Sequence, residues 1–425
     1  MKKTLLPLLL LVTLLYPGCE ASPLAEPSRS DESLFREESA PPLLFAEPED
    51  LGVPLAPRYA NDPAQRIAMT PRDLILFRGN LYVGSGDWGG NLGPVEMYCY
   101  DTAQKRWIHS GTLPDEEVSA FHVIENTLFA PGIDPRDSWS WGNLYFSEDG
   151  VWQTKRTIPG GIHCFDLAYL DGLLFAAVKT EGEALQAALS PDLGETFTLL
   201  PLRKNGAPVT DERFYFDLLT IGENVYAICD KELYRYNGTA FAYETSWEDT
   251  VKRKQYNAPK RMNLFLAKAI VGETTYFTTG VFYACSSPNR LREIELPENA
   301  VAYDLYVYEN NLYVLCNLLT EEGYTVTVYR YLSEGDEFIR ETAFKSAIPA
   351  VSFACDDTAF YFGMASNNFK HTDHGRIDGK RNIFLLCPRT FHNIKLQLDL
   401  FVEEHGNHDT NGRFIDGHII AHSQD

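Results

Sequence analysis

The stretch Asp166-Leu-Ala-Tyr-Leu-Asp-Gly-Leu-Leu-Phe175 decides the fold of this chain. It places an apolar run on each side of Asp171-Gly172, a dipeptide that favours the two-residue turn of a β-hairpin. The same shape recurs at 73–82, 217–226 and 304–313, and looser copies begin at Ala120, Ala267 and Ser352. The chain therefore repeats one hairpin unit along most of its length.

The spacing of these copies predicts the architecture. Their first residues are separated by 47, 46, 51, 50, 37 and 48 positions. A period in this range that is carried by strands is typical of a β-propeller. We therefore expect an all-β fold, a seven-bladed β-propeller spanning 71–401, in which each blade has four antiparallel strands, a to d from the axis outward. The blades are expected at 72–113, 119–158, 163–202, 214–245, 263–296, 301–344 and 350–400.

A second series of marks follows the first. Trp107, Trp152, Phe197 and Phe241 are spaced by 45, 45 and 44 residues, and each is expected to open a strand d. The turn before Phe197 places an Asp that can bond the backbone, a Gly for a positive φ and an aromatic that packs beneath the turn. A shortened version precedes Trp152. We assign structural roles to Ser190, Asp192, Gly194, Phe197, Ser147, Asp149, Gly150 and Trp152.

Ser190-Pro-Asp-Leu-Gly-Glu-Thr-Phe197 matches the pattern S-x-D-x-G-x-T-[WF]. The repeats thus resemble those of Asp-box (BNR, sialidase-like) and kelch-like β-propellers. This resemblance implies a propeller, but the motif also occurs in propellers that bind nothing sugar-like. A working sialidase of this family would carry an arginine triad and an R-I-P block before the first repeat. Here Arg156-Thr-Ile-Pro159 lies in strand d of the second blade, and no arginine heads the early strands in the manner of that family.

The N-terminus has the features of an export signal. Lys2 and Lys3 precede the apolar run Leu5–Leu15, which is too short to span a bilayer as a helix, and Gly18-Cys19 closes it. This resembles a bacterial lipoprotein signal, although Tyr16 stands where Leu is usual. The resemblance implies that 1–18 is a signal peptide, that Cys19 is lipidated, and that the protein is anchored to a membrane of the cell envelope. The alternative is a plain secretory signal.

Two further segments lie outside the expected propeller. Residues 19–70 are rich in Pro, Ser and Glu and lack a lasting period, so we interpret them as a tether, of which part of 43–67 could still pack on the propeller. Residues 402–425 form a tail with four His, which we interpret as solvated.

Composition bears on partners and cofactors. The net charge of −22 argues against a nucleic-acid partner, which would attract a basic surface. We expect a monomer, with no cofactor and no metal site. The remaining cysteines sit singly in apolar strands without C-x-x-C spacing, which favours small buried hydrophobes over metal ligands or a disulfide framework. They are Cys99, Cys164, Cys229, Cys285, Cys316, Cys355 and Cys387.

Loops on one face of a propeller are the usual place for a ligand, because they vary without disturbing strand pairing. On that face lie the d-to-a connections and the b-to-c loops, here 84–93 in the first blade and 132–142 in the second. These loops contain three Trp beside charged residues, which suits sugar rings and other polar ligands with one apolar side. Alternatively, the indoles anchor long loops. The ligand-binding candidates are Trp88, Asp134, Arg136, Trp139, His163 and Asp166.

An Asp recurs at the head of strand a and should ring the mouth of the central channel. Such carboxylates could raise one another's pKa, hold a cation or act as a general acid. Alternatively, each accepts hydrogen bonds from the backbone of the neighbouring blade, and recurrence in four blades favours this role. The functional hypothesis is non-catalytic binding of a glycan or an envelope protein; the alternative is a glycoside-processing enzyme. The four residues are Asp73, Asp166, Asp217 and Asp304.

Overall fold

The computed structural model describes residues 45–55, 68–182, 184–210, 216–254, 266–364 and 384–388. All of them belong to one compact unit, Leu44–Asp425. The expected lipidation site Cys19, the signal peptide and the tail from 402 onward lie outside the described residues. Within these ranges the chain is built of strands, and helix is confined to single 3-10 turns such as η2 (Trp88–Gly90) and η3 (Pro297–Asn299). The all-β expectation is confirmed.

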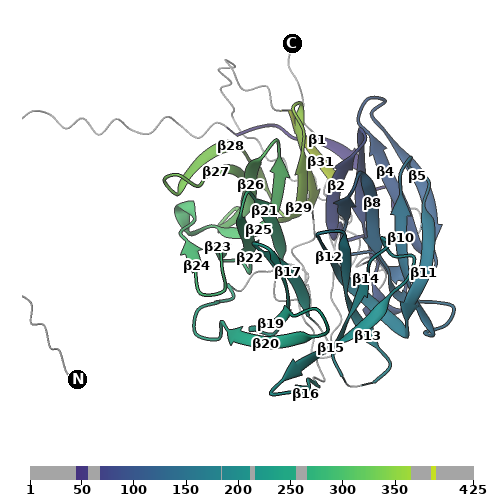
Figure 1. Cartoon of the computed structure of the whole chain (residues 1–425). Coiled ribbons are helices and arrows are strands. Elements are labelled where there is room, and N and C mark those ends of the chain that lie inside the picture. The colour runs from purple at the N-terminus through teal and green to yellow at the C-terminus, as the bar shows by residue number, and fades with distance from the viewer. Residues whose placement is uncertain are drawn as a thin grey trace, which may run out of the picture. The chain divides into compact units, whose positions relative to one another are not determined.

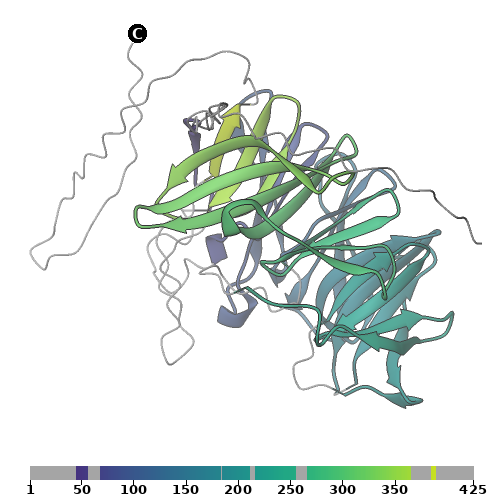
Figure 2. The same cartoon turned by 90° about the vertical axis from the view of Figure 1, so that its left-hand side faces the viewer.

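The strands form antiparallel sheets of four that follow one another along the chain in a propeller-like arrangement. Figure 1 shows the sheets side by side around a common centre, with β2, β12, β17, β25 and β29 toward the middle, and Figure 2 shows them from another side. The first sheet contains β2 (Asp73–Phe77), β3 (Asn80–Gly84), β4 (Val95–Asp101) and β5 (Arg106–Leu113). The second contains β7 (His122–Ile124), β8 (Thr127–Pro131), β10 (Trp141–Ser147) and β11 (Gln153–Pro159).

The next sheet is longer, with eleven strands, because two sets of four are joined edge to edge. Their outermost strands, β15 and β20, pair in parallel. The first set is β12 (Gly161–Leu170), β13 (Leu173–Thr180), β14 (Gln186–Ser190) and β15 (Thr198–Lys204), and the second is β17 (Asp217–Ile221), β18 (Asn224–Cys229), β19 (Glu232–Tyr236) and β20 (Phe241–Ser246). The short strands β6 (Asp115–Glu117), β9 (Ile133–Pro135) and β16 (Ala207–Pro208) complete it.

Three sheets of four strands follow. One contains β21 (Ala267–Val271), β22 (Thr274–Thr278), β23 (Phe282–Cys285) and β24 (Leu291–Ile294). Another contains β25 (Val301–Tyr308), β26 (Asn311–Thr320), β27 (Gly323–Leu332) and β28 (Glu337–Ser346). The last is made of β29 (Ala350–Cys355), β30 (Ala359–Met364), β31 (Phe384–Pro388) and, from the start of the chain, β1 (Glu49–Gly52).

The position of β1 corrects the expected tether at 19–70. Asp50 pairs with Leu385 in the last sheet, so the sheet-forming region begins at Glu49 rather than at 71. Leu51 also accepts a 2.6 Å hydrogen bond from the indole of Trp107 in the first sheet. This strand has four residues and a single large apolar side chain, too short a pattern to be recognised against the Pro-rich sequence around it.

Turn chemistry explains why the repeats form hairpins. Asp171 and Gly172 both have positive φ, 51° and 78°, as a two-residue hairpin turn with matching strand twist requires. The expected turn before Phe197 is also present. Ser190 Oγ accepts from the Gly194 amide at 2.7 Å, and Asp192 Oδ1 accepts from the Thr196 amide at 2.8 Å. The shortened version uses Ser147 Oγ and Asp149 Oδ1 in the same way, at 2.9 and 3.1 Å.

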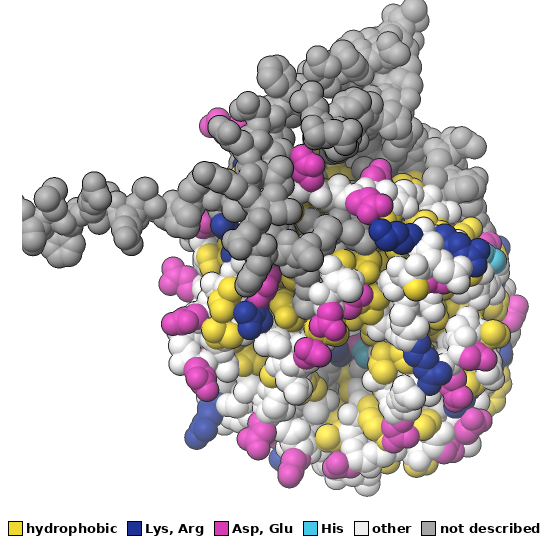
Figure 3. Space-filling view, turned by 90° about the horizontal axis from the view of Figure 1, so that it is seen from above, with side chains coloured by type: hydrophobic (Ala, Val, Ile, Leu, Met, Phe, Trp, Pro, Cys, Tyr) yellow, Lys and Arg dark blue, Asp and Glu magenta, His cyan; other side chains and the backbone are white. Residues whose placement is uncertain are grey.

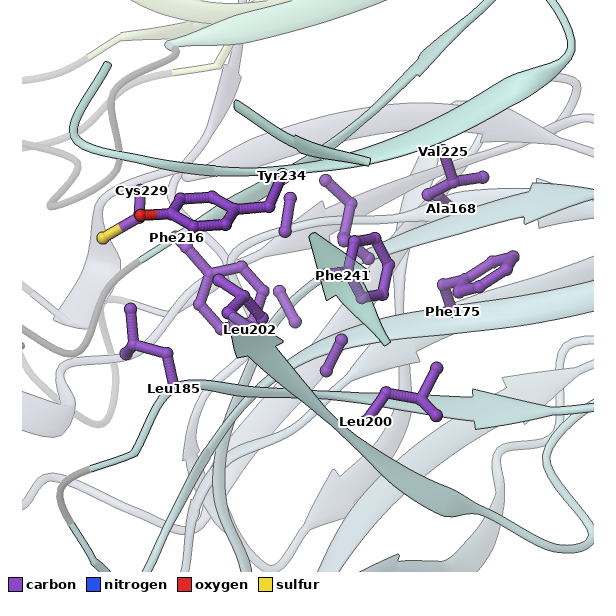
Figure 4. Close-up of a cluster of buried hydrophobic side chains, with 14 of the residues drawn as sticks. Ala168, Phe175, Leu185, Leu200, Leu202, Phe216, Val225, Cys229, Tyr234 and Phe241 are labelled. Carbon is purple, nitrogen blue, oxygen red and sulfur yellow. The ribbon is translucent and has the colours of Figure 1, made fainter. Parts of the chain in front are cut away.

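The aromatic residues after these turns are where the spacing predicted. Trp107 lies at the start of β5 and Phe241 at the start of β20, while Trp152 and Phe197 directly precede β11 and β15. They pack between neighbouring sheets. Figure 4 shows one such cluster, in which Phe241 lies among Phe175, Leu202 and Tyr234. The six cysteines whose side chains the structure describes are buried, as expected for small hydrophobes.

The charges on the surface and the length of the helices both bear on possible partners of the protein. Over the face drawn in Figure 3, acidic side chains are spread around the rim and are interspersed with hydrophobic and basic ones. Within the described residues, no helix has the length and the apolar character that crossing a bilayer would require.

Adjacent inner strands are joined by carboxylates. Asp73 Oδ2 accepts from the amide of Phe121 at 2.7 Å, Asp166 Oδ2 from that of Leu218 at 2.9 Å, and Asp304 Oδ2 from that of Phe353 at 2.9 Å. Each bond runs from one sheet to the start of the next. Asp217 is also buried. The recurring Asp thus has the backbone-binding role that its repetition favoured.

We predict that Asp304→Ala lowers the free energy of unfolding by about 3 kcal/mol. The change leaves the buried amides of Leu305 and Phe353 without the carboxylate that accepts from both, and each unsatisfied group costs about 1–3 kcal/mol. Denaturant titration measures the difference. The control is Asp249→Ala in an exposed turn, which should change stability by less than about 0.5 kcal/mol. Equal stability of the two variants would contradict the linking role.

Candidate functional site

Two b-to-c loops and one connection between sheets meet on one side of the first three sheets. β6 pairs with β9, and β9 pairs with β12 at Ile133 and His163. Gly86, in the loop after β3, forms a bridge with Glu117 of β6. The structure therefore brings together the loops around Trp88 and Trp139 with the start of the strand that carries His163. We call the surface formed by 84–93, 115–117 and 132–143 the Trp face.

The six tryptophans divide into two groups. Trp139 and Trp141 are 48% and 46% exposed. The others are partly or fully buried: Trp88 packs against the cluster of Figure 4, Trp107 and Trp152 against neighbouring cores, and Trp247 is buried. Trp88 is thus buried as a loop anchor would be, whereas Trp139 and Trp141 are about half exposed. Exposed indoles two residues apart form an apolar surface that folding leaves in water.

Hydrogen bonds fix the loop that carries these indoles. The Trp139 indole donates to Asp134 Oδ1 at 3.1 Å. Arg156, on β11, donates to the Ser138 carbonyl at 2.5 Å and to Asn143 Oδ1 at 3.2 Å. The loop is thus tied both to itself and to the sheet beneath it. A loop that is already braced loses less conformational entropy when a ligand binds, so binding costs less free energy.

Asn143 extends this support into the interior. Its amide donates to both oxygens of the buried Asp115, at 3.4 and 3.3 Å, and to the Tyr145 hydroxyl at 3.1 Å. Burial raises the pKa of Asp115 to about 6, against the opposing effects of Tyr145, Asn143 and Arg156. A continuous polar network therefore links a buried carboxyl group to the loop of Trp139.

Arg136 joins the two loops. Its guanidinium donates to the Gly93 carbonyl, and its backbone amide donates to the Pro114 carbonyl at 3.0 Å. The residue itself is exposed, so the outer part of its side chain remains accessible beside Trp139. Of the predicted ligand candidates, Arg136, Trp139 and the half-buried Asp134 lie on the surface.

The remaining candidates lie beneath it. His163 is 7% exposed and stacks on Phe165, while Trp88 meets its ring edge-to-face with centroids 4.9 Å apart. Burial, with a smaller effect of Lys179, lowers the pKa of His163 to about 4, so its imidazole is neutral at physiological pH. His163 and Trp88 therefore support the loops from within rather than facing a ligand. Pairing between β9 and β12, which is distant in sequence, causes this burial.

The carboxylate of Asp166 is also occupied by contacts within the protein. Besides the Leu218 amide, its carboxylate accepts from the Leu167 amide at 2.9 Å and from Lys268 Nζ, and His122 Nε2 lies 3.4 Å away. Burial alone would raise the pKa of Asp166, but Lys268 and His122 outweigh it and bring the pKa well below its usual range. This carboxylate is a charged structural contact and is not available as a general acid.

Sequence reasoning missed three acidic residues in the connection before the second sheet. Asp115, Glu116 and Glu117 form β6 and are all buried. Glu117 lies 3.3 Å from the guanidinium of Arg72. Burial, helped by Asp134, raises the pKa of Glu116 to about 7. The signal was the run Pro114-Asp-Glu-Glu-Val118 in a d-to-a connection, which belongs to the ligand-accessible face.

These carboxylates do not make a metal centre. Across the ranges that the structure describes, no group of three or more His, Cys, Asp or Glu side chains is arranged to hold a metal ion. The arginines explain part of this, because Arg72 lies beside Glu117 and Arg136 lowers the pKa of Glu116 by its charge. The described residues of the Trp face present exposed indoles and hydrogen-bonding groups.

We predict that Asp115→Asn flattens the pH dependence of stability between about pH 4 and pH 6. The folded-state pKa of Asp115, about 6, exceeds its unfolded value, so the folded state binds the proton more tightly. Unfolding free energy consequently falls as pH rises through this window, by roughly 3 kcal/mol for a two-unit shift. Chemical denaturation at several pH values measures the slope.

The control for this series is Asp249→Asn, an exposed carboxylate that should leave the slope unchanged. A part of the slope should survive in Asp115→Asn, because Glu116 also has a raised pKa. Parallel curves for wild type and Asp115→Asn would show that Asp115 does not titrate as its burial requires.

Comparison with known proteins does not assign the chain to a family. No family model matches the chain, and no curated protein matches it. The chain is similar to the crystal structure of the computationally designed Ika8 protein, at 9% identity and a TM-score of 0.42, over 75% of this chain and 96% of that one. It is also similar to the extracellular domain of a protein described as a hybrid two component system from B. thetaiotaomicron, at 14% identity and a TM-score of 0.46. That alignment covers 74% of this chain but only 38% of the other.

Proposed function

We propose that this protein binds a glycan on the Trp face and performs no chemistry on it. One observation carries the proposal: Trp139 and Trp141 are about half exposed in a loop that hydrogen bonds hold in place, whereas the other tryptophans pack into the fold. Leaving two indoles in water on a braced loop is unfavourable unless something covers them.

The polar groups around the indoles favour a sugar over an apolar ligand. A sugar ring presents C–H groups on one side and hydroxyls at its edge, which suits an indole flanked by hydrogen-bonding charges. Asp134 accepts the hydrogen bond of the Trp139 indole, and the exposed Arg136 and Asp137 belong to the same loop. An envelope protein that covers the same indoles is the competing ligand, and binding assays separate the two.

The glycoside-processing alternative has less support. It required carboxylates at the channel mouth that are free to act, but Asp73, Asp166 and Asp304 accept backbone amides of neighbouring sheets. If one of these carboxyl groups moved to donate a proton to a substrate, the hydrogen bond that it accepts from the neighbouring strands would break, and the fold would be destabilised. We therefore favour binding without catalysis.

We also propose that the complete ring has seven blades of the Asp-box or kelch-like type. In support, the first six expected blades each correspond to one set of four strands, and the seventh to three strands that β1 completes from outside the expected range. Two of these sets share the long sheet through β15 and β20. The hydrogen bonds of the 190–197 turn are those that the Asp-box pattern would need.

The membrane anchor is likewise a proposal, which rests on the sequence Gly18-Cys19 after a charged and apolar N-terminus. We expect Cys19→Ala to release the protein from the membrane fraction of a bacterial host, because processed lipoproteins carry more than one acyl chain and stay bound. Fractionation and mass spectrometry measure this. A Cys19→Ala protein that is still cleaved and still wholly membrane-bound would contradict lipidation at this residue.

For binding, we predict that Trp139→Ala weakens affinity about thirtyfold, the equivalent of about 2 kcal/mol for a well-buried aromatic contact, with thermal stability nearly unchanged. A glycan array identifies the ligand, and calorimetry measures affinity. Asp192→Ala should behave in the opposite way, lowering the melting temperature and leaving affinity intact, because Asp192 bonds only its own turn.

Tyr243→Ala is the matched aromatic control, since Tyr243 is also exposed but lies on β20, away from the Trp face. It should bind like wild type. A ligand whose affinity depends on Asp192 or Tyr243 and not on Trp139 would place the site elsewhere. Loss of folding in Trp139→Ala without any change in binding per folded molecule would also refute the proposal.

A further inference from the structure

Two carboxylates face each other across the β6–β9 pair. Asp115 lies opposite Pro135 and Glu117 opposite Ile133, so the register places Glu116 opposite Asp134. Side chains directly opposite in an antiparallel pair stand on the same face, with Cβ atoms about 5 Å apart, and like charges at such positions repel. The carboxylates of Glu116 on β6 and Asp134 on β9 thus form an electrostatically unfavourable pair near the exposed indoles.

The groups around Glu116 do not compensate the negative charge of its ionised carboxylate. The residue is 7% exposed, and its Oε2 has no hydrogen-bond partner. The charged groups that act on it are Asp134, Asp115 and Asp87, which disfavour its ionised form, and Arg136, which favours it. Burial is the largest influence, and together these raise the pKa of Glu116 to about 7. Near neutral pH the Glu116 carboxyl group is therefore protonated in part of the molecules.

Asp134 connects this pair to the ligand surface. Its Oδ1 accepts the hydrogen bond of the Trp139 indole, and its backbone has a φ of 62°, a left-handed conformation that non-glycine residues adopt at some cost. Asp134 therefore has a strained backbone and lies near a second carboxylate that would repel its own when both are charged. A new charge on its neighbour can therefore displace it.

We propose that Glu116 is a positioning residue that makes the Trp face sensitive to pH by acting through Asp134 on the indole of Trp139. When Glu116 is protonated, Asp134 is unopposed and holds the indole in place. When the proton leaves to solvent, repulsion between the two carboxylates weakens the hydrogen bond that the Trp139 indole donates to Asp134. Ligand affinity should then be higher below neutral pH than above it, and this consequence alone rests on the proposed function.

The test needs no ligand, because it follows the indole. Tryptophan emission and acrylamide quenching of the full-length protein are recorded from about pH 5.5 to pH 8.5. We expect emission to move to longer wavelength and quenching to increase around pH 7, as the equilibrium between held and loosened indole shifts about two- to fivefold. Trp139→Phe should abolish the transition, which assigns the signal to this indole.

Glu116→Gln is the decisive variant, since its amide mimics the protonated acid and should keep the low-pH spectrum throughout. The control is Glu148→Gln, which removes an exposed carboxylate in the turn after β10 and should retain the transition. If circular dichroism shows that Glu116→Gln is unfolded, Glu116→Asp replaces it and should shift the midpoint. A wild-type protein without a transition, or a transition that survives unchanged in the folded Glu116 variant, would overturn the proposal.

The two proposals fail separately. If the indole titrates with Glu116 but no glycan binds, the proposed function is wrong and this inference stands. If a glycan binds through Trp139 with the same affinity at pH 6 and pH 8, the inference is wrong and the proposed function stands.

Discussion

The contact on which this structure depends is a carboxylate at the start of an inner strand that accepts an amide from the next sheet. Inner strands are sheet edges, and their buried backbone groups need partners that the sheet itself does not provide. Asp73, Asp166 and Asp304 supply them. Ser352, at the same place in its repeat, joins its sheet to the first through a 2.8 Å bond to the Pro71 carbonyl. These bonds join neighbouring repeats near the common centre of the structure.

This use of the recurring Asp determines where function can lie. Because three of the carboxylates at the centre are bonded to backbone, the polar groups that we propose for binding are in the loops above the first three sheets. There the buried Asp115, Asn143 and Arg156 hold a loop that presents two indoles to solvent. The same network that stabilises the loop places ionisable groups beneath it. The rigidity of the loop and the proposed pH sensitivity of the Trp face thus both come from the burial of acidic residues in β6.

Features set by local sequence could be predicted, and those set by distant pairing could not. The Asp171-Gly172 turn and the positions of Trp107, Trp152, Phe197 and Phe241 follow from spacing and turn chemistry. Strand β1 was missed because four residues give no periodicity and its partner lies more than 300 positions away. The burial of His163 and the acidic strand β6 both depend on β9, a three-residue strand whose pairing no local pattern reveals.

Hydrogen exchange with and without a glycan from the array tests most directly whether the Trp face is the working surface. Bound glycan should slow exchange of the backbone amides in 132–143, with a smaller effect in 84–93, because both loops border the two exposed indoles. Amides of the 190–197 turn should exchange at the same rate in both samples. Protection confined to that turn, or to other turns of its kind, would contradict the account.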